Sequence, residues 1–377
     1  MSEFKCPVVR VESVIDHPNA DRLSIIKLVN LGYTCISAKL DDLSHRYKVG
    51  DLVAYIPSSS VLPPDLLQIM GFWDSEAERG TLSGSNGNRV KPMKLRGIFS
   101  EGLLYPFYMI NIASKSDNVL SDVSDILGIK KYEPPIPVAM AGQLANLTGY
   151  TLSYDFERWE SVPDIFEPGE MVVVSEKLHG TMTAILFHPN LNHPEMFGKN
   201  GEIVVHSKGL GARGLAFKNV PENQNNLYVR QLQILLDSGL EDKMRSLSET
   251  NNNSVVCVVG ETYGQGVQDL TYGLSKPEFS AFDISVNGQW LTPHEFSRAA
   301  ITSNLPMVPT PYVGPFDLNK IIHFRDGRSF IGGQNIREGL VVRSIDGSRH
   351  PEHGRRIAKF ISPDYLLRKS NNATEFN

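Results

Sequence analysis

Lys177 is the residue whose type and setting best suit nucleophilic chemistry. It follows an apolar run typical of a β-strand, in the string Gly169-Glu-Met-Val-Val-Val-Ser-Glu-Lys-Leu-His-Gly-Thr181, and it stands just before a glycine turn. This setting presents the lysine rather than burying it. A lysine amine attacks phosphorus only when neutral, so its site must lower its pKa by desolvation or by a nearby cation. A bound divalent metal ion would do this.

Three neighbours of Lys177 suit the same chemistry. Gly180 lets the backbone approach a nucleotide closely, and His179 can reach a leaving pyrophosphate from the same side of a strand. Glu176 is a candidate for contact with a base, although an exposed strand carboxylate is an equal alternative. The pattern Lys-x-His-Gly is short and occurs often by chance, so it needs support from elsewhere in the chain.

That support comes from five strings that follow in order. They are Ser207-Lys-Gly209, Val258-Val-Gly-Glu-Thr-Tyr-Gly264, Phe279-Ser-Ala-Phe-Asp-Ile284, Arg337-Glu-Gly-Leu-Val-Val-Arg343 and Arg356-Ile-Ala-Lys-Phe-Ile361. With the lysine string, this series resembles motifs I, Ia, III, IIIa, IV and V of the covalent nucleotidyltransferase superfamily of DNA ligases, RNA ligases and mRNA capping enzymes. The likeness spans about residues 172–366.

The resemblance implies a role for each motif residue. Lys177 would attack the α-phosphorus of ATP and hold AMP through a P–N bond. Glu261 and Glu338 would hold ribose hydroxyls or a metal ion, Mg²⁺ or Mn²⁺; in the family the first usually contacts ribose and the second usually serves the metal. Phe282 would stack on adenine while Phe279 packs inside, and the two could exchange these roles.

Lys359 interrupts an apolar strand, where an unpaired ammonium would be costly unless it served a phosphate or a carboxylate. In the resemblance it is the motif V lysine, and a catalytic role follows. Many relatives carry two lysines separated by one residue, whereas here Ile357 and Ile361 occupy both positions where the second lysine would stand. Arg355, Arg356 or Lys369 could supply the missing cation.

Other polar residues are weaker candidates. Lys208 and Arg213 could bind the nucleotide or the incoming strand, and solvated loop cations are an equal alternative for each. We expect His206, His350 and His353 to lie in loops without forming a metal site, because no second ligand stands at zinc spacing.

Short β-rich runs and turn clusters in the first hundred residues predict a small β-barrel ahead of these motifs. Two of its strings, His17-Pro-Asn-Ala-Asp-Arg-Leu23 and Arg96-Gly-Ile-Phe-Ser-Glu-Gly-Leu103, resemble OB-type tRNA-binding domains such as that of the phenylalanine-tRNA synthetase beta chain. OB barrels bind strands by stacking bases on aromatic side chains in a basic groove. Candidates for this, with ordinary surface or core roles as the alternative, are Lys91, Lys94, Arg96, Phe72 and Phe99.

A barrel ahead of the transferase motifs, with histidine at 179 where DNA ligases usually have aspartate, looks most like the Deinococcus-type, or fifth, family of RNA ligases. DNA ligases and capping enzymes place their barrel after motif V, and eighteen residues follow Lys359 here.

The expected fold class is α+β. An OB-type barrel is expected in residues 1–115, a connector and the start of the second domain in 116–168, and an ATP-grasp-like adenylyltransferase domain of antiparallel sheets with flanking helices in 169–377. Within the connector, residues 117–128 and 139–149 read as helices.

Composition narrows the class of protein. With 37 basic and 42 acidic residues among 377, the formal net charge is -5. This argues against an indiscriminate binder of phosphate backbones and requires a local patch instead. Three cysteines without paired spacing suggest neither a disulfide framework nor a cysteine metal site. Without a secretion signal or a spanning apolar stretch, a soluble, cytoplasmic protein without membrane partners is expected.

The expected function is ATP-dependent RNA ligation, which joins 3′-hydroxyl and 5′-phosphate ends through lysyl-AMP and an adenylylated 5′ end. The expected cofactors are ATP and Mg²⁺ or Mn²⁺. The expected partner is RNA or a nicked duplex with RNA on the 3′-hydroxyl side, and no obligate protein partner is predicted. The alternatives are a GTP-dependent capping-type guanylyltransferase and a non-catalytic OB protein with a dead transferase domain.

Overall fold

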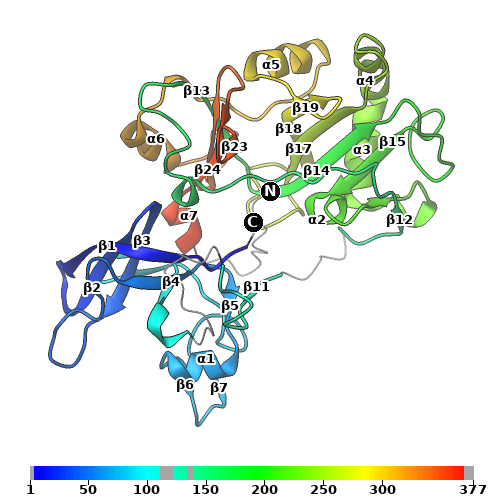
Figure 1. The fold of residues 1–377 in the computed structure, drawn as a ribbon. Coiled ribbons are helices and arrows are strands. Elements are labelled where there is room, and N and C mark those ends of the chain that lie inside the picture. Colours follow the sequence, from blue (N-terminus) through cyan, green and yellow to red (C-terminus); the bar gives the residue numbers. More distant parts are fainter. Residues whose placement is uncertain (1–3, 111–121, 134–139, 369–377) are drawn as a thin grey trace. The chain divides into compact units, whose positions relative to one another are not determined.

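The chain forms two compact units in the computed structural model (Figure 1). The structure describes residues 4–110, 122–133 and 140–368. The N-terminal unit comprises the first two of these ranges together with residues 159–164, and the C-terminal unit comprises residues 140–158 and 165–368. The N-terminal unit is therefore discontinuous in sequence.

The N-terminal unit is built on a five-stranded antiparallel sheet in the order β10-β4-β1-β2-β3. These strands are β1 (Val8–His17), β2 (Ala20–Leu28), β3 (Leu31–Ala38), β4 (Leu52–Ile56) and β10 (Leu103–Pro106). Alternate residues of β4 enter two different apolar clusters, with Ala54 and Ile56 in one and Val53 and Tyr55 in the other. Because successive strand side chains point to opposite faces, β4 is buried on both sides.

The closed barrel expected from the sequence is not seen. Strands β3 and β10 form the two edges of the sheet, and no strand pairing joins them within the described ranges. The edge of β3 meets the segment that precedes β10 instead. There Glu101 N–H donates to the Thr34 carbonyl at 2.9 Å, and Ile36 N–H donates to Ser100 Oγ at 2.9 Å.

Shorter elements complete the N-terminal unit. They are β5 (Ser60–Val61), α1 (Pro64–Ile69), β6 (Trp73–Asp74), β7 (Arg79–Gly80), β8 (Met93–Leu95), β9 (Ile98–Ser100), η1 (Phe107–Met109), β11 (Lys130–Lys131) and η3 (Trp159–Ser161).

The two strings that carry the OB resemblance contact each other at the β8–β9 hairpin. A ring nitrogen of buried His17, Nε2, lies 3.1 Å from the Leu95 carbonyl oxygen, and Asn19 Nδ2 donates to the Arg96 carbonyl at 3.0 Å. Arg96 has a positive φ of 46°, followed by Gly97 with φ 95°. The histidine string therefore stabilises the tight turn that the arginine-glycine string makes.

The C-terminal unit contains two larger antiparallel sheets, in the orders β20-β13-β21-β24 and β15-β14-β17-β18-β19 (Figure 1). The first comprises β13 (Met171–Lys177), β20 (Tyr312–Pro315), β21 (Gly339–Ser344) and β24 (Ile357–Ile361). The second comprises β14 (Gly180–Phe187), β15 (Ile203–Ser207), β17 (Val256–Gly264), β18 (Pro277–Val286) and β19 (Gln289–Trp290). The expected α+β class with antiparallel sheets is confirmed.

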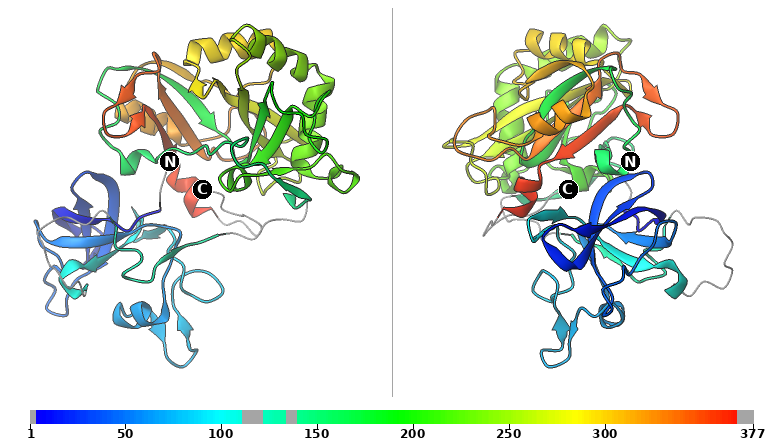
Figure 2. Two further views of the ribbon diagram at one scale, coloured as in Figure 1. Left: turned by 45° about the vertical axis from the view of Figure 1, so that its right-hand side comes forward. Right: turned by 90° about the vertical axis from the view of Figure 1, so that its left-hand side faces the viewer.

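Helices α3, α4 and α5 pack on the second sheet, where their apolar side chains share one core with β14, β15, β17 and β18 (Figure 2). The helices of this unit are α2 (Lys208–Gly211), η4 (Pro221–Asn223), α3 (Leu227–Asp237), α4 (Leu240–Glu249), α5 (Pro293–Thr302), α6 (Leu318–Arg325) and α7 (Pro363–Leu367). Across the described ranges, every helix is too short or too polar to cross a membrane.

The connector differs from the sequence prediction. A helix over 139–149 is wrong, because Leu144–Asn146 forms β12 and pairs with β16 (Leu215–Phe217). This pairing gives the backbone long-range hydrogen-bond partners, and tertiary context outweighs local helix propensity. Residues 122–128 are not helical, and residues 117–121 lie outside the described ranges.

Replacing Gly260 by alanine should destabilise the second sheet. A Cβ at Gly260 would overlap the Phe279 ring and lie 2.6 Å from the Ser280 carbonyl oxygen. We expect a loss of about 2 kcal/mol in the free energy of unfolding, measured by urea denaturation, because overpacking typically costs this much. Gly209→Ala is the matched control, since nothing lies within 4 Å of its added Cβ. Equal effects of the two substitutions would contradict the prediction.

Candidate active site

The site lies where the chain passes from one sheet to the other. Lys177, the last residue of β13, pairs with Gly339 of β21 in the first sheet. Gly180, the first residue of β14, pairs with Tyr263 of β17 in the second. Two residues therefore span the change of sheet, and Lys177 lies at the junction with its side chain 21% exposed, so it is more buried than its sequence setting predicts.

Two carboxylates surround the Lys177 ammonium. Its Nζ lies 2.6 Å from Glu338 Oε1, and the side chains of Lys177 and Glu338 are 21% and 6% exposed. Glu261 comes from β17 of the other sheet and acts electrostatically on the same ammonium. The structure thus brings together three of the predicted residues, one of them from the second sheet.

This arrangement sets the protonation of the site. Burial lowers the pKa of Lys177, but the nearby Glu338 and Glu261 carboxylates outweigh burial, so its pKa is raised. Burial raises the pKa of Glu261 to about 8, with Lys177 opposing and Glu338 assisting. Lys177 is consequently held as an ammonium in the free protein, and burial disfavours the ionised form of Glu261.

Lys359 and Lys208 meet at a carboxylate that the sequence analysis did not single out. Asp155 Oδ1 lies 3.0 Å from Lys359 Nζ and 2.9 Å from Lys208 Nζ. Burial lowers the pKa of Lys359 to about 8, against the pull of Asp155 and with help from the other two lysines. Asp155 was missed because its importance depends on a partner 204 residues away.

His179 is buried and has both ring nitrogens engaged. Nε2 lies 2.6 Å from Asp269 Oδ1, and Nδ1 lies 2.7 Å from the Tyr365 hydroxyl. The backbone N–H of His179 also donates to the Tyr272 hydroxyl at 2.6 Å. Arg368 pairs with the same aspartate at 3.2 Å. These contacts fix the link between β13 and β14, whereas direct contact of His179 with pyrophosphate stays a prediction.

Gly180 lies where no side chain fits. An added Cβ would overlap the Thr262 carbonyl oxygen and lie 3.0 Å from Glu261 Cγ. The Gly180 N–H donates a hydrogen bond to the Glu261 carboxylate. The glycine therefore allows strands β14 and β17 to approach at the site, in addition to the nucleotide contact predicted for it.

Glu176 is buried rather than exposed. Its Oε2 accepts the Phe330 N–H at 2.8 Å, while Oε1 is buried without a hydrogen-bond partner. Burial raises its pKa.

Of the two phenylalanines, Phe279 is 5% exposed within the helix-covered core, which confirms its packing role. Phe282 is only partly buried, and its ring lies 5.5 Å from that of Tyr154.

The arginines considered as substitutes for a second motif V lysine are paired elsewhere. Arg355 forms a bidentate pair with fully buried Asp283, and Arg356 pairs with Glu170. Lys369 lies outside the described ranges. Arg213 is exposed, and its Nε donates to the Gly209 carbonyl at 3.2 Å.

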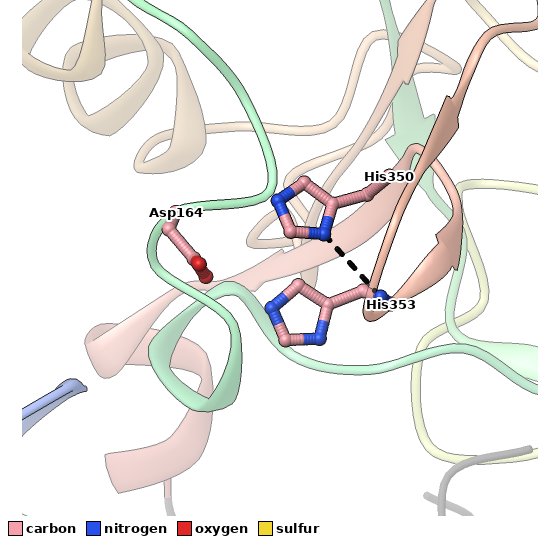
Figure 3. A group of neighbouring side chains, drawn as sticks. All are labelled: Asp164, His350 and His353. Carbon is pink, nitrogen blue, oxygen red and sulfur yellow. Dashed lines mark hydrogen bonds between the residues drawn. The ribbon is translucent and has the colours of Figure 1, made fainter.

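The histidines are placed differently from one another. His206 lies in β15 and is fully buried, so its expected loop position is wrong. His350 and His353 flank the turn between β22 (Arg349–His350) and β23 (Gly354–Arg355), with rings stacked 4.6 Å apart (Figure 3). Asp164, also drawn there, belongs to the N-terminal unit.

Three of the five strand-binding candidates lie on the β8–β9 hairpin of the N-terminal unit. Lys94 and Arg96 are exposed, and Phe99, which pairs with Lys94, is partly exposed. Lys91 is partly buried just before the hairpin, and Phe72 packs against the core of the unit. The hairpin therefore presents two cations and one aromatic ring to solvent.

Glu261 and Glu338 fit a divalent cation. They are oxygen donors beside one lysine, Glu261 in β17 and Glu338 directly before β21, and burial raises the pKa of Glu261, an effect that a bound cation would oppose. Hard cations such as Mg²⁺ and Mn²⁺ prefer such carboxylate ligands.

Comparison with known proteins identifies the family. The family model described as RNA ligase matches residues 170–361, about half of the chain, and an OB-fold domain model matches residues 6–107. The chain belongs to the RNA ligase family and carries an N-terminal OB-fold domain. Both expectations from the sequence are confirmed at this level. No curated protein sequence matches the chain.

Solved structures show the same fold. Naegleria gruberi RNA ligase with PPi is 24% identical, with a TM-score of 0.73 over 97% of this chain and 98% of that one. Mutants of the same ligase with ATP and Mn, and with AMP and Mn, are 23% identical, each with a TM-score of 0.73 over 96% of this chain and 98% of the other. The likeness extends through both units.

Glu261→Gln should raise the stability of the metal-free protein more at pH 7.5 than at pH 4.5. The folded-state pKa of about 8 lies above the ordinary value for a glutamate. Raising the pH between these two values therefore costs the wild type stability, and glutamine is spared this cost. Thermal unfolding in EDTA at both pH values measures it, with exposed Glu249→Gln as the control. A gain that shrinks as the pH rises would contradict the prediction.

Proposed function

We propose that this protein is an ATP-dependent RNA ligase that works through a lysyl-AMP intermediate. The observation that carries the proposal is the position of Lys177 at the junction of the sheets, beside Glu338 and Glu261. Lys359 and Lys208 supply further positive charge in the same region, since both Lys208 and Lys177 lower the pKa of Lys359. Family membership and the bound ATP, AMP and Mn of the Naegleria structures support this choice of nucleotide.

In the first step, Lys177 loses its ammonium proton to water, and its neutral nitrogen attacks the α-phosphorus of ATP. A P–N bond forms, the bond from the α-phosphorus to the bridging oxygen breaks, and pyrophosphate leaves with the electron pair. A divalent ion held by Glu261 and Glu338 would supply the positive charge that lowers the pKa of Lys177. Lys359 stabilises negative charge on the phosphate oxygens.

Two further transfers complete the cycle. The 5′-phosphate of a nucleic acid attacks the lysyl-AMP phosphorus, which frees Lys177 and leaves an adenylylated 5′ end. The 3′-hydroxyl of the other end then attacks that 5′-phosphate, forms a phosphodiester and releases AMP. The contribution of the protein is alignment and electrostatic stabilisation, because each step is a displacement at phosphorus.

The finer proposal is a ligase of the Deinococcus type that seals nicks in duplexes with RNA on the 3′-hydroxyl side. The order of an OB-fold domain followed by the ligase region supports it. In this proposal the N-terminal unit holds the strand, with exposed Lys94 and Arg96 contacting phosphates and Phe99 stacking on a base.

Lys177→Ala should abolish covalent labelling by [α-³²P]ATP in the presence of Mg²⁺ or Mn²⁺. The label should be acid-labile and alkali-stable, because a P–N bond is formed. Denaturing electrophoresis measures it, with Lys199→Ala, an exposed lysine paired with Asp242, as the matched control. Labelling by GTP in place of ATP would favour a capping-type transferase, and absence of label with both nucleotides would favour a non-catalytic role.

Nicked duplexes that differ only at the 3′-terminal sugar test the finer proposal. A ribose should be sealed about tenfold faster or more than a deoxyribose, because the 2′-hydroxyl distinguishes RNA from DNA at a given position. Single-turnover sealing with preadenylylated 5′ ends measures this, because such ends bypass the first two steps and leave only the attack of the 3′-hydroxyl. Equal rates would contradict the preference while leaving the lysyl-AMP mechanism in place.

A further inference from the structure

One carboxylate oxygen lies between the two lysines proposed to contact phosphate. Asp155 Oδ1 lies 2.9 Å from Lys208 Nζ and 3.0 Å from Lys359 Nζ. The side chains of Asp155 and Lys359 are only 13% and 12% exposed, and that of Lys208 is 33% exposed. A phosphate oxygen that bound both ammonium groups would need the position that this carboxylate oxygen holds.

The segment that carries Asp155 is attached on both sides. Before it, the Leu152 N–H donates to His206 Nε2 at 3.1 Å, and the Tyr154 hydroxyl donates to Asp283 Oδ2 at 2.9 Å. After it, the Lys359 N–H donates to the Glu157 carbonyl at 3.0 Å. These contacts hold the backbone of the segment against β15, β18 and β24. The carboxylate is thus directed at the lysines by a fixed segment rather than by a loose loop.

Asp155 belongs to a group of titratable side chains that interact within the site. The side chains that interact electrostatically here are three lysines and three carboxylates: Lys177, Lys208, Lys359, Asp155, Glu261 and Glu338. A divalent cation would offset the two glutamates. In the described part of the chain, Asp155, Glu261 and Glu338 do not lie close enough together to form a group of potential metal ligands. We therefore do not count Asp155 among the residues that would hold the cation. The negative charge of Asp155 then remains beside any bound phosphate.

We propose that Asp155 is an internal counter-anion that competes with the phosphates of ATP for Lys208 and Lys359, and that it thereby weakens the binding of the nucleotide. This inference rests on the proposed ligase function. An entering phosphate must displace the carboxylate from the two ammonium groups or bear its repulsion at close range. A carboxylate that served only to position Lys359 would have the opposite effect, since its removal would weaken binding.

Asp155→Asn tests the competition, because it removes the charge and keeps the shape. The rate of lysyl-AMP formation is measured by [α-³²P]ATP labelling in single turnovers over a range of ATP concentrations. We expect the half-saturating ATP concentration to fall about tenfold, as befits removal of one nearby negative charge. Asp155→Ser, which also removes the charge, should lower it in the same direction.

Three controls isolate the cause. Asp155→Glu keeps the charge and should lower the half-saturating ATP concentration much less than Asp155→Asn does. Asp242→Asn removes an equal charge from an exposed ion pair with Lys199 and should have no effect. Thermal unfolding of each variant establishes that it is folded at the assay temperature.

An unchanged or higher half-saturating ATP concentration in folded Asp155→Asn would overturn the inference, as would an equal fall in Asp155→Glu. A higher half-saturation combined with a lower maximal rate would identify Asp155 as a positioning residue instead. If the wild type forms no lysyl-AMP at all, the proposed function fails, which is a different result from normal labelling with unaltered ATP dependence.

Discussion

The change of sheet between Lys177 and Gly180 is the constraint on which the rest of the site depends. Strand β13 before this link is hydrogen-bonded to β21 in the first sheet, and strand β14 after it is hydrogen-bonded to β17 in the second. Both sheets therefore fix the position of the lysine. Because Glu338 directly precedes β21 and Glu261 lies in β17, the same crossing brings one carboxylate from each ladder to the ammonium. The chemical groups are thus positioned by strand register, and preorganised groups of this kind need little rearrangement during reaction.

A second layer of contacts secures the crossing from behind. His179, in the link itself, is held by Asp269 and by Tyr365 of α7, while Arg368 pairs with that aspartate. Burial raises the pKa of Asp269, but the bonds from His179 and Arg368 outweigh it and keep the carboxylate ionised. Helix α7 therefore helps to position the link between β13 and β14, although its sequence contains none of the motif strings.

Local sequence predicted those features whose chemistry is contained in neighbouring residues. Lys177, with its strand and its glycine, was found in this way, and the motif series led to Glu261, Glu338 and Lys359. Asp155 could not be found from its own sequence surroundings, because its partner Lys359 is 204 residues away. The failed helix over 139–149 has a similar cause, since strand β16, which β12 pairs with, comes much later in the chain.

The discontinuity of the N-terminal unit limits how the protein can be divided. Residues 159–164 return to that unit, where the Ser161 hydroxyl bonds the Tyr33 hydroxyl at 2.9 Å and Trp159 packs against Gly32. A single cut that frees residues 4–133 separates them from this segment and exposes the surface that the segment covers. The other fragment then keeps Trp159 without the surface on which it packs. A faithful excision of the OB-fold domain therefore requires two cuts and a new covalent connection that restores the missing segment.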